Sequence, residues 1–594
     1  MSDAAICYSL RVLEPQAHLF ALTLTIAQPA ALQCVRLPVW IPGSYLVREF
    51  AKNLQRLKAQ QDGKSVALTQ LDKSSWQMAC KTDQPLMLHY EIYALDNSVR
   101  TAWLDAERGF FNGTSVFLQV QGQENLPHAL ELVATKSLPG WQVATGLAPR
   151  KITPNGFGLY LAANYEELVD APVEMGKFWS GSFVAAGIPH RFVVAGATPS
   201  FDGERLLADS QAICEAEIKF WHGTKTGSRA FGKAPHKNYL FMLNAVDEGY
   251  GGLEHRNSTA LLCQRKDLPR QRQASDAKPK QADGYTTLLG LISHEYFHTW
   301  NVKRLRPAEF RQYDYARENY TQLLWFFEGF TSYYDDLLLR RAGLIDDATY
   351  LKRLGNTINQ VRQTPGQKVQ SVAQASFDAW VKYYRTDENT PNATVSYYTK
   401  GSLVALCLDL SLRHEGKTTL DAVMRTLWRR CVGGPMTEND LAAVLADLAG
   451  RSFTKEIASW VHGTADLPLK PLLTAQGLAV LEEPAPIAER LGLRVTESDG
   501  VRIKSVLRGG AAEQAGFAAG DEWLGLTLGK AKSASGWHLT KLDEIMLYAG
   551  NTSKIGVLVS RDKRLLKLSL ALPQSVTTWR LAVRDAKLVK PWLN

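Results

Sequence analysis

The sequence predicts a multidomain α+β protein, because the spacing of apolar residues changes along the chain. Up to about residue 172, short runs such as Ala21–Ile26 alternate apolar and polar residues, which is typical of strands with one buried face. From about 285 to 475, apolar residues recur every three or four positions, which is typical of amphipathic helices. Residues 485–575 return to short strands with glycine turns. We therefore expect an N-terminal β-sandwich, a mainly helical middle part and a small third domain.

Length and composition are those of an ordinary globular protein. The chain has 594 residues, of which 45% are hydrophobic and 21% are charged, so it should contain several domains without need of disulfides. The net charge is +9, but the basic residues form no long run and no nucleic-acid-binding motif is present. We expect a solvated basic surface and no nucleic-acid partner.

The cysteines and the N-terminus predict a cytoplasmic protein. Seven cysteines lie far apart and form no C-x-x-C pair, which favours a reducing compartment. The N-terminal residues Met1–Ile6 have neither the basic nor the apolar region of a signal peptide. No apolar run approaches the roughly 18 residues that span a bilayer, so we expect no membrane partner.

An H-E-x-x-H motif lies inside a helical pattern in the middle of the chain. Residues 294–298 read His-Glu-Tyr-Phe-His. With about 3.6 residues per turn, His294 and His298 project from one helix face, where two imidazoles can bind one zinc ion. Glu295 lies about 100° around the helix and can act as general base on a water molecule. The alternative is an amphipathic helix whose two histidines are satisfied by hydrogen bonds.

A catalytic zinc ion usually takes three protein ligands, and two downstream glutamates are candidates for the third. Glu318 lies in a polar stretch, whereas Glu328 lies among the aromatic residues of Trp325–Thr331. A bare carboxylate is costly to bury, and a metal ion is a suitable partner for it. We therefore expect one Zn²⁺ per chain, bound by His294, His298 and Glu328, with Glu318 solvated or in a supporting role.

The segments 294–301 and 327–330 together resemble the gluzincin metallopeptidases, and more narrowly the glycyl aminopeptidase family, whose members carry a PDZ domain. The stretch WIPGSYLVREF at 40–50 also resembles that family. The resemblance covers nearly the whole chain and implies an order of parts. These are an N-terminal antiparallel β domain (1–172), a thermolysin-like zinc catalytic domain (173–475, with a β part at about 173–264 and a helical part at about 285–475), a PDZ domain (485–575) and a C-terminal tail (576–594).

The position of the third ligand separates this chain from the larger aminopeptidase N family. Here 29 residues lie between His298 and Glu328. In the aminopeptidase N family the glutamate follows the second histidine more closely, at a position that is Arg317 in this chain. The spacing therefore favours the branch that carries a PDZ domain.

The sequence Gly-Gly-Leu-Glu-His at 251–255 resembles the G-x-M-E-N strand of aminopeptidases, with Leu and His in place of Met and Asn. By that resemblance, the strand, including Gly251 and Gly252, pairs with the substrate backbone, and Glu254 binds the free α-amino group. A fixed carboxylate beside the metal would select a charged N-terminus. The alternative is a glutamate in an ordinary turn.

Tyr398 begins the sequence Tyr-Thr-Lys-Gly, which resembles the Y-x-K-G segment of these enzymes. By that resemblance its hydroxyl would donate a hydrogen bond to the oxyanion of the tetrahedral intermediate. Tyr397 is adjacent and is a second candidate for this donor. The alternative is a tyrosine that only packs in the core or caps a helix.

Two segments near the C-terminus resemble a PDZ domain. Leu-Gly-Leu-Arg at 491–494 precedes a strand-like stretch, and the segment 510–521 contains a short helical pattern and a Gly-Asp turn. PDZ domains bind peptide C-termini by strand addition. The module is either a site for peptide capture or a structural part that docks on the catalytic domain.

Together these features predict a zinc aminopeptidase that releases N-terminal residues from peptides. The family resemblance implies a preference for small N-terminal residues, glycine or alanine. Two alternatives remain at this point. One is a zinc endopeptidase that uses the same metal site, and the other is a PDZ peptide-binding scaffold with a vestigial metal site.

Overall fold

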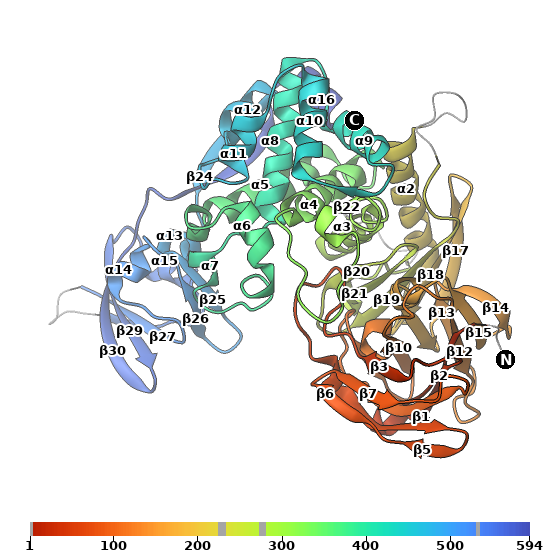
Figure 1. Cartoon of the computed structure of the whole chain (residues 1–594). Coiled ribbons are helices and arrows are strands. Elements are labelled where there is room, and N and C mark those ends of the chain that lie inside the picture. The colour runs from red at the N-terminus through yellow and green to blue at the C-terminus, as the bar shows by residue number, and fades with distance from the viewer. Residues whose placement is uncertain (1–3, 224–232, 272–280, 530–534) are drawn as a thin grey trace. The chain divides into compact units, whose positions relative to one another are not determined.

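The computed structural model of the chain describes residues 4–223, 233–271, 281–529 and 535–594 (Figure 1). It confirms a multidomain α+β fold with a β-rich N-terminal region and a largely helical later region. The chain divides into two compact units. Unit 1 contains residues 1–320, 341–344 and 424–437, and unit 2 contains residues 321–340, 345–423 and 438–594.

The N-terminal region of unit 1 contains three sheets around one hydrophobic core. Alternating burial along the strands, as in Ile6–Glu14, reflects the alternating sequence pattern. Contrary to an all-antiparallel arrangement, β1 (Ile6–Glu14) and β12 (His128–Val133) pair in parallel, because the chain forms other strands before it returns beside β1. The eight-stranded sheet has the order β14 (Ala148–Ile152), β15 (Gly158–Ala162), β12 (His128–Val133), β1 (Ile6–Glu14), β2 (Leu19–Ile26), β8 (Leu86–Tyr93), β4 (Leu54–Gln61), β5 (Lys64–Val66).

Two smaller sheets and a short helix complete this region. The helix α1 (Tyr165–Val169) is capped by Asn164, whose side chain accepts a hydrogen bond from the Glu167 backbone. The first small sheet has the order β13 (Gln142–Thr145), β16 (Val173–Gly176), β10 (Arg108–Phe111), β9 (Ala102–Leu104). The second has the order β11 (Gln119–Val120), β3 (Leu32–Arg36), β7 (Ser75–Ala79), β6 (Thr69–Asp72).

A five-stranded sheet in the rest of unit 1 carries the predicted substrate strand. Its order is β17 (Trp179–Ala185), β18 (Ile188–Ala195), β19 (Tyr239–Val246), β21 (Ser258–Gln264), β20 (Gly251–Glu254). Helix α3 (Asp283–Phe297) packs on β20, on β21 and on helix α2 (Gly203–His222). The H-E-x-x-H helix therefore lies directly against the edge strand β20. A pair of two-residue strands, β22 (Arg306–Pro307) and β23 (Pro435–Met436), is also in unit 1.

The helices predicted from apolar spacing are present. Helix α3 ends at Phe297, because the chain turns sharply after His298, and Val302 in this turn has a φ of +144°. Helix α8 is buried along most of its length. The helices outside the C-terminal module are α4 (Leu324–Arg341), α5 (Asp347–Arg362), α6 (Val372–Phe377), α7 (Thr390–Ala393), α8 (Thr399–Glu415), α9 (Leu420–Arg430), α10 (Glu438–Ala449), α11 (Thr454–Trp460) and α12 (Leu469–Ala475).

A small β module with its own core follows the helices in unit 2. Before and after it, the chain forms a two-stranded antiparallel sheet from β24 (Leu478–Pro484) and β31 (Thr577–Val583). The module contains α13 (Ile487–Leu491), β25 (Leu493–Thr496), β26 (Val501–Val506), α14 (Ala511–Ala515), β27 (Glu522–Leu528), β28 (Ser535–His538), α15 (Glu544–Ala549), β29 (Lys554–Arg561) and β30 (Arg564–Ala571).

The last 19 residues are structured and do not form a simple tail. After β31, helix α16 (Ala586–Leu593) ends the chain, and the indole nitrogen of its buried Trp592 donates a hydrogen bond of 3.0 Å to the Tyr333 hydroxyl. The tryptophans in this segment were the signal for burial that the prediction of a tail overlooked.

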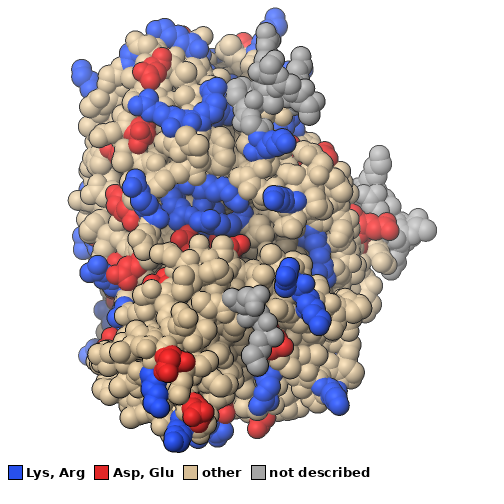
Figure 2. Space-filling view, turned by 45° about the vertical axis from the view of Figure 1, so that its right-hand side comes forward, with Lys and Arg blue, Asp and Glu red and all other residues tan. Residues whose placement is uncertain are grey.

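The charged surface, the helices and the cysteines of the described residues are those of an ordinary globular protein. On the face that Figure 2 shows, Lys and Arg side chains gather near the middle of the view, with Asp and Glu side chains beside them. In the described part of the chain, every helix is too short or too polar to cross a bilayer. None of the seven cysteines forms a disulfide with another described cysteine.

Candidate active site

The two histidines of the motif lie one helical turn apart on α3, as predicted. His294 is half-buried and His298 is buried, and their ring centroids are 4.7 Å apart. His298 directly follows the last residue of α3, and its backbone is still helical. Both imidazoles therefore project from the same end of one helix.

The chain after His298 fixes the orientation of that imidazole. Its Nδ1 lies 2.7 Å from the backbone oxygen of Asn301, so Nδ1 carries the proton and Nε2 keeps a lone pair for a metal. Val302 follows with a φ of +144° while 97% buried, a conformation that costs about 1–3 kcal/mol for a residue with a side chain. This strained turn directs the Asn301 carbonyl toward His298.

Glu328 lies in helix α4, where only 2% of its surface is exposed. The next residue, Gly329, faces Gly401 of helix α8, and a β-carbon at Gly329 would lie 2.6 Å from the Gly401 α-carbon. A β-carbon at Gly401 would in turn lie 2.6 Å from the backbone oxygen of Trp325. The two helices therefore touch backbone to backbone, and the glycines after Glu328 and Lys400 make this contact possible.

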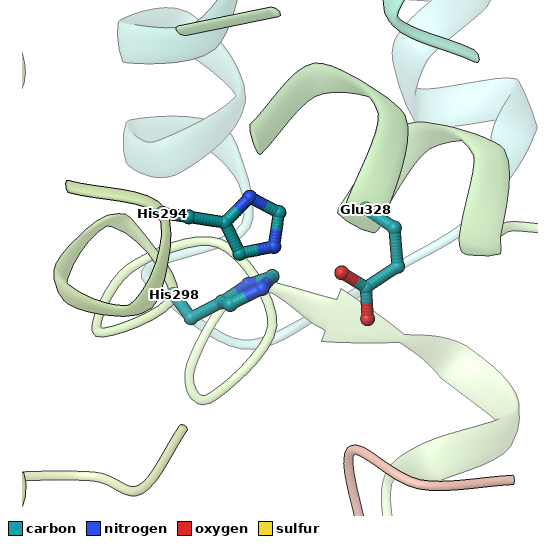
Figure 3. Close-up of side chains that lie close together, drawn as sticks. All are labelled: His294, His298 and Glu328. Atoms are coloured by element: carbon teal, nitrogen blue, oxygen red, sulfur yellow. The ribbon is translucent and has the colours of Figure 1, made fainter. Parts of the chain in front are cut away.

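His294, His298 and Glu328 form one cluster of candidate metal ligands (Figure 3). Each offers one ligand atom, and these atoms all lie within 4.8 Å of one another. Glu318 belongs to no such cluster within the described residues. Two imidazole nitrogens and one carboxylate oxygen, held by a hydrogen bond behind one imidazole, are a donor set that fits a catalytic zinc ion.

Glu295 lies against the edge strand β20. A β-carbon placed on Gly252 would overlap the Glu295 carboxylate and would lie 2.6 Å from its Cγ. Glu295 is buried, with 4% of its surface exposed. Residue 252 must therefore lack a side chain for Glu295 to occupy this position.

Glu254 lies two residues further along the same strand. Side chains at i and i+2 of a strand point to the same face, about 7 Å apart, so the carboxylates of Glu254 and Glu295 lie on one face of β20. The Glu254 side chain is 95% buried, yet it accepts no hydrogen bond from any residue in the described ranges. A buried carboxylate without such a partner is costly, which makes this position suited to a cationic ligand.

A buried ion cluster supports this end of the strand. The Lys303 ammonium lies 2.7 Å from Asp170, and Nδ1 of His255 lies 3.1 Å from the same carboxylate. Burial raises the pKa of Asp170, but the charges of Lys303 and His255 hold it well below its usual range. Burial lowers the pKa of Lys303, but Asp170 and, more weakly, Glu254 raise it above its usual value. Asp170 thus links the turn after α3 to the residue beside Glu254.

The two candidate oxyanion donors differ in exposure. Tyr397 is completely buried, whereas Tyr398 is half-buried, and their rings stack with centroids 4.8 Å apart. Burial raises the pKa of Tyr398 well above its usual value, and the charge of Glu328 raises it further. The Tyr398 hydroxyl therefore keeps its proton and can donate a hydrogen bond.

A histidine pair supports α3 from the side of the five-stranded sheet. The Tyr296 hydroxyl lies 2.9 Å from His190 Nε2 and 3.0 Å from His236 Nε2. Burial lowers the pKa of His190 to about 4 and that of His236 to about 3. Both imidazoles are therefore neutral at pH 7.

The sequence prediction did not include the supporting residues Asp170, Lys303, His190 and His236. They lie far from each other in the sequence and belong to no motif with fixed spacing. A buried charge or imidazole becomes visible only when the fold brings its partner to it. The one local signal was the number of charged residues in the segment 302–306, directly after the metal motif.

Two family patterns match the chain. The M61 glycyl aminopeptidase pattern matches residues 287–404, and the Peptidase M61 N-terminal domain matches residues 7–177. A comparison with curated proteins found no match.

The chain is also similar to several solved structures. The aminopeptidase N family protein from Idiomarina loihiensis is 36% identical, with a TM-score of 0.92, and the match covers 99% of this chain and 100% of that chain. The M1 zinc metallopeptidase of Deinococcus radiodurans, a variant bound to a Tyr-Ser-Ala substrate, is 15% identical with a TM-score of 0.46, covering 78% of this chain and 94% of that one. Legionella pneumophila aminopeptidase A is 11% identical with a TM-score of 0.48, and the match covers 97% of this chain and 58% of that one. On the first structure and the two patterns, the chain belongs to the M61 glycyl aminopeptidase family.

Proposed function

We propose that this peptidase-family protein is a zinc-dependent aminopeptidase with His294, His298 and Glu328 as the metal ligands. The observation that carries the proposal is the convergence of two imidazole nitrogens and a buried carboxylate within 4.8 Å. When bound, zinc supplies Lewis-acid chemistry, which polarises the scissile carbonyl and makes water a better nucleophile. A cytoplasmic location stays a prediction.

Strand β20 and Glu254 bind the substrate in this proposal. The strand lies at the edge of its sheet, so a peptide backbone can pair with it. Glu254 is buried, and in this proposal its carboxylate accepts hydrogen bonds from the protonated α-amino group. Gly251 and Gly252 belong to the part of the strand that pairs with the substrate backbone, and the space beside Gly252 is occupied by Glu295.

Glu295 is the general base. It takes a proton from the attacking water and passes it to the nitrogen of the leaving amine. The arrangement along β20 supports exopeptidase action, because Glu295 contacts the Gly252 position and Glu254 is two residues, about 7 Å, further along the same strand. In this arrangement Glu254 can bind the α-amino group while Glu295 activates the water that attacks the carbonyl of the same residue.

Tyr398 donates a hydrogen bond to the oxyanion of the tetrahedral intermediate. Its partial exposure supports this role over Tyr397, which has no exposed surface. A Tyr398→Phe variant should lose about 100-fold or more in kcat with little change in KM, as for other oxyanion donors. Tyr397→Phe should retain most of the activity, and the reverse result would assign the role to Tyr397.

The test of the aminopeptidase assignment is a comparison of free and blocked substrates. Purified protein should hydrolyse glycine and alanine 4-nitroanilides and leave their N-acetyl derivatives intact. Glu254→Gln should raise KM for the free substrates by about tenfold or more, because a charge-assisted hydrogen bond is lost. Cleavage of blocked peptides that is unaffected by Glu254→Gln would instead support an endopeptidase. The preference for glycine or alanine rests on the family description.

We also propose that residues 485–575 form a PDZ domain. A separate core, and an edge strand β25 directly after the left-handed Gly492 (φ +72°), support this. The Asn392 side chain donates to the Val506 carbonyl and accepts from the Arg508 backbone, both at 2.9 Å, which supports a docked, structural role for the module. Binding of peptides with free C-termini to β25, measured by fluorescence anisotropy, would support peptide capture instead.

A further inference from the structure

A turn from the N-terminal β region packs directly on the Glu254 carboxylate. The Ser44 backbone nitrogen donates to the Ile41 carbonyl at 3.1 Å, with Pro42 and Gly43 between them. Gly43 has a φ of +88°. Proline at the second position and a glycine with positive φ at the third are typical of a type II turn.

The contact of this turn with Glu254 is close. A β-carbon placed on Gly43 would lie 2.6 Å from both carboxylate oxygens of Glu254 and 2.8 Å from Cδ1 of Leu253. Both oxygens therefore face the α-carbon of Gly43, and residue 43 has no room for a side chain. The Glu254 carboxylate is covered on this side by main chain alone.

The turn is anchored firmly on both sides. The Trp40 indole nitrogen donates to the Asp314 carbonyl at 2.8 Å, and the Val39 backbone nitrogen donates to the Tyr315 carbonyl at 2.9 Å. The Arg48 guanidinium donates to the Ser44 hydroxyl at 2.6 Å. Trp40 and Ser44 are completely buried. The turn cannot withdraw from Glu254 without breaking these contacts.

We propose that the Pro42–Gly43 turn is a specificity-determining wall of the amine site, an inference that rests on the proposed function. When an α-amino group is bound to Glu254, the turn lies beside the amino group, on the side that points away from the scissile bond. The wall admits an unsubstituted primary ammonium group and excludes any residue or acyl group ahead of it. The substrate class is therefore peptides with a free N-terminus, and the N-terminal β region, together with Glu254, sets this selectivity.

Gly43→Ala tests the wall because it moves Glu254 while leaving Glu295 in place at the other end of β20. Gly122→Ala is the matched control: Gly122 is in the same region, has a φ of +82°, and has no atom of the described residues within 4 Å of its β-carbon position. Both variants place alanine at a similar positive φ, but only Gly43→Ala adds a clash with the described residues. Zinc content and melting temperature are measured for both.

For glycine 4-nitroanilide, we expect Gly43→Ala to raise KM by about tenfold or more and to change kcat by less than about threefold. Gly122→Ala should stay within about twofold of the wild type in both. Equal KM values for the two variants would overturn the proposed wall, while a KM increase in Glu254→Gln would show that the aminopeptidase assignment still stands. If Glu254→Gln also had no effect, the amine-binding role of Glu254 itself would fail.

A second measurement covers the case in which Gly43→Ala does not fold. The Glu295→Gln variant is crystallised with triglycine, which it should bind without cleavage. We expect the ammonium nitrogen within hydrogen-bond distance of Glu254 and in van der Waals contact with the α-carbon of Gly43. An ammonium group bound away from Gly43, with open space ahead of it, would overturn the proposal.

Discussion

Gly252 and Glu295 are in direct contact, and the contact leaves no space for a β-carbon at residue 252. Gly252 has no positive φ, so glycine is required here for space and not for backbone conformation. Glu295, the proposed general base, is thereby positioned by the main chain of the same strand that we expect to bind the substrate.

The first prediction concerns this contact. Gly252→Ala should displace the Glu295 carboxylate and reduce kcat by about 100-fold, because general-base catalysis depends on position. The measurement is kcat on glycine 4-nitroanilide together with zinc content, which should not change. Gly536→Ala is the control, since among the described residues the atom nearest its β-carbon position belongs to Thr527, at 3.8 Å. Full activity of Gly252→Ala would contradict the placement of the base.

The second prediction isolates the role of Glu295 from its position. Glu295→Gln keeps the size of the side chain but removes its basicity, so kcat should fall by about 10²–10⁴-fold. Metal analysis should still find one zinc ion per chain, because Glu295 is not a ligand. Activity close to that of the wild type would show that another group takes the proton from water.

The third prediction concerns the contact between helices α4 and α8. Gly401→Ala should lower the free energy of unfolding by about 1–3 kcal/mol and should also reduce kcat, since the clash moves Tyr398 relative to Glu328. Gly355→Ala, in helix α5, is the matched control because its β-carbon meets no atom closer than 3.6 Å; alanine there should be neutral or stabilising. Similar melting temperatures for the two variants would contradict the backbone contact.

The fourth prediction is a loss of stability in acid caused by buried histidines. The pKa of His190 is lowered to about 4 and that of His236 to about 3, against about 6.5 in an unfolded chain. The unfolded state therefore binds more protons below pH 6.5, so the free energy of unfolding falls as the pH drops from 6.5 toward 4. For His190 alone the loss is on the order of 3 kcal/mol.

Urea titrations between pH 7 and pH 4 measure this effect. A His190→Gln variant, which retains a hydrogen-bonding group but does not titrate, should show a shallower pH dependence than the wild type. An identical pH dependence in the two proteins would exclude His190 as a source of the acid sensitivity.

The fifth prediction concerns Asp170. Asp170→Asn leaves the Lys303 ammonium buried without its counter-charge, which should lower the free energy of unfolding by about 3–5 kcal/mol. The double variant Asp170→Asn, Lys303→Met should recover part of this loss, because it removes the unpaired charge. A double variant as unstable as the single one would show that the ion pair itself is not the cause.

The sequence predicted most of the fold because its signals were local. Helices α3, α5 and α10 follow directly from apolar spacing, and the alternating run at Leu19–Ile26 is a strand. The long-range features were not accessible in this way. The parallel pairing of β1 with β12 and the return of Trp592 to Tyr333 depend on residues that lie far apart in the chain.

In the candidate site too, local features could be predicted from the sequence and long-range contacts could not. The two histidines and Glu295 share one helical turn, so their relative positions followed from helix geometry. The supporting contacts could not be predicted in this way. Asp170 and His255 are 85 residues apart in the sequence, and Gly43, which contacts Glu254, belongs to the N-terminal β region. Such contacts carry no periodic signal, although they hold the site in place.

Anomalous diffraction at the zinc absorption edge, on crystals of the untreated protein, would show whether these three side chains bind zinc. We expect one strong peak per chain, about 2.0–2.2 Å from a nitrogen of His294, a nitrogen of His298 and an oxygen of Glu328. A peak at other residues, or a zinc-supplemented crystal with no peak near these three side chains, would contradict it.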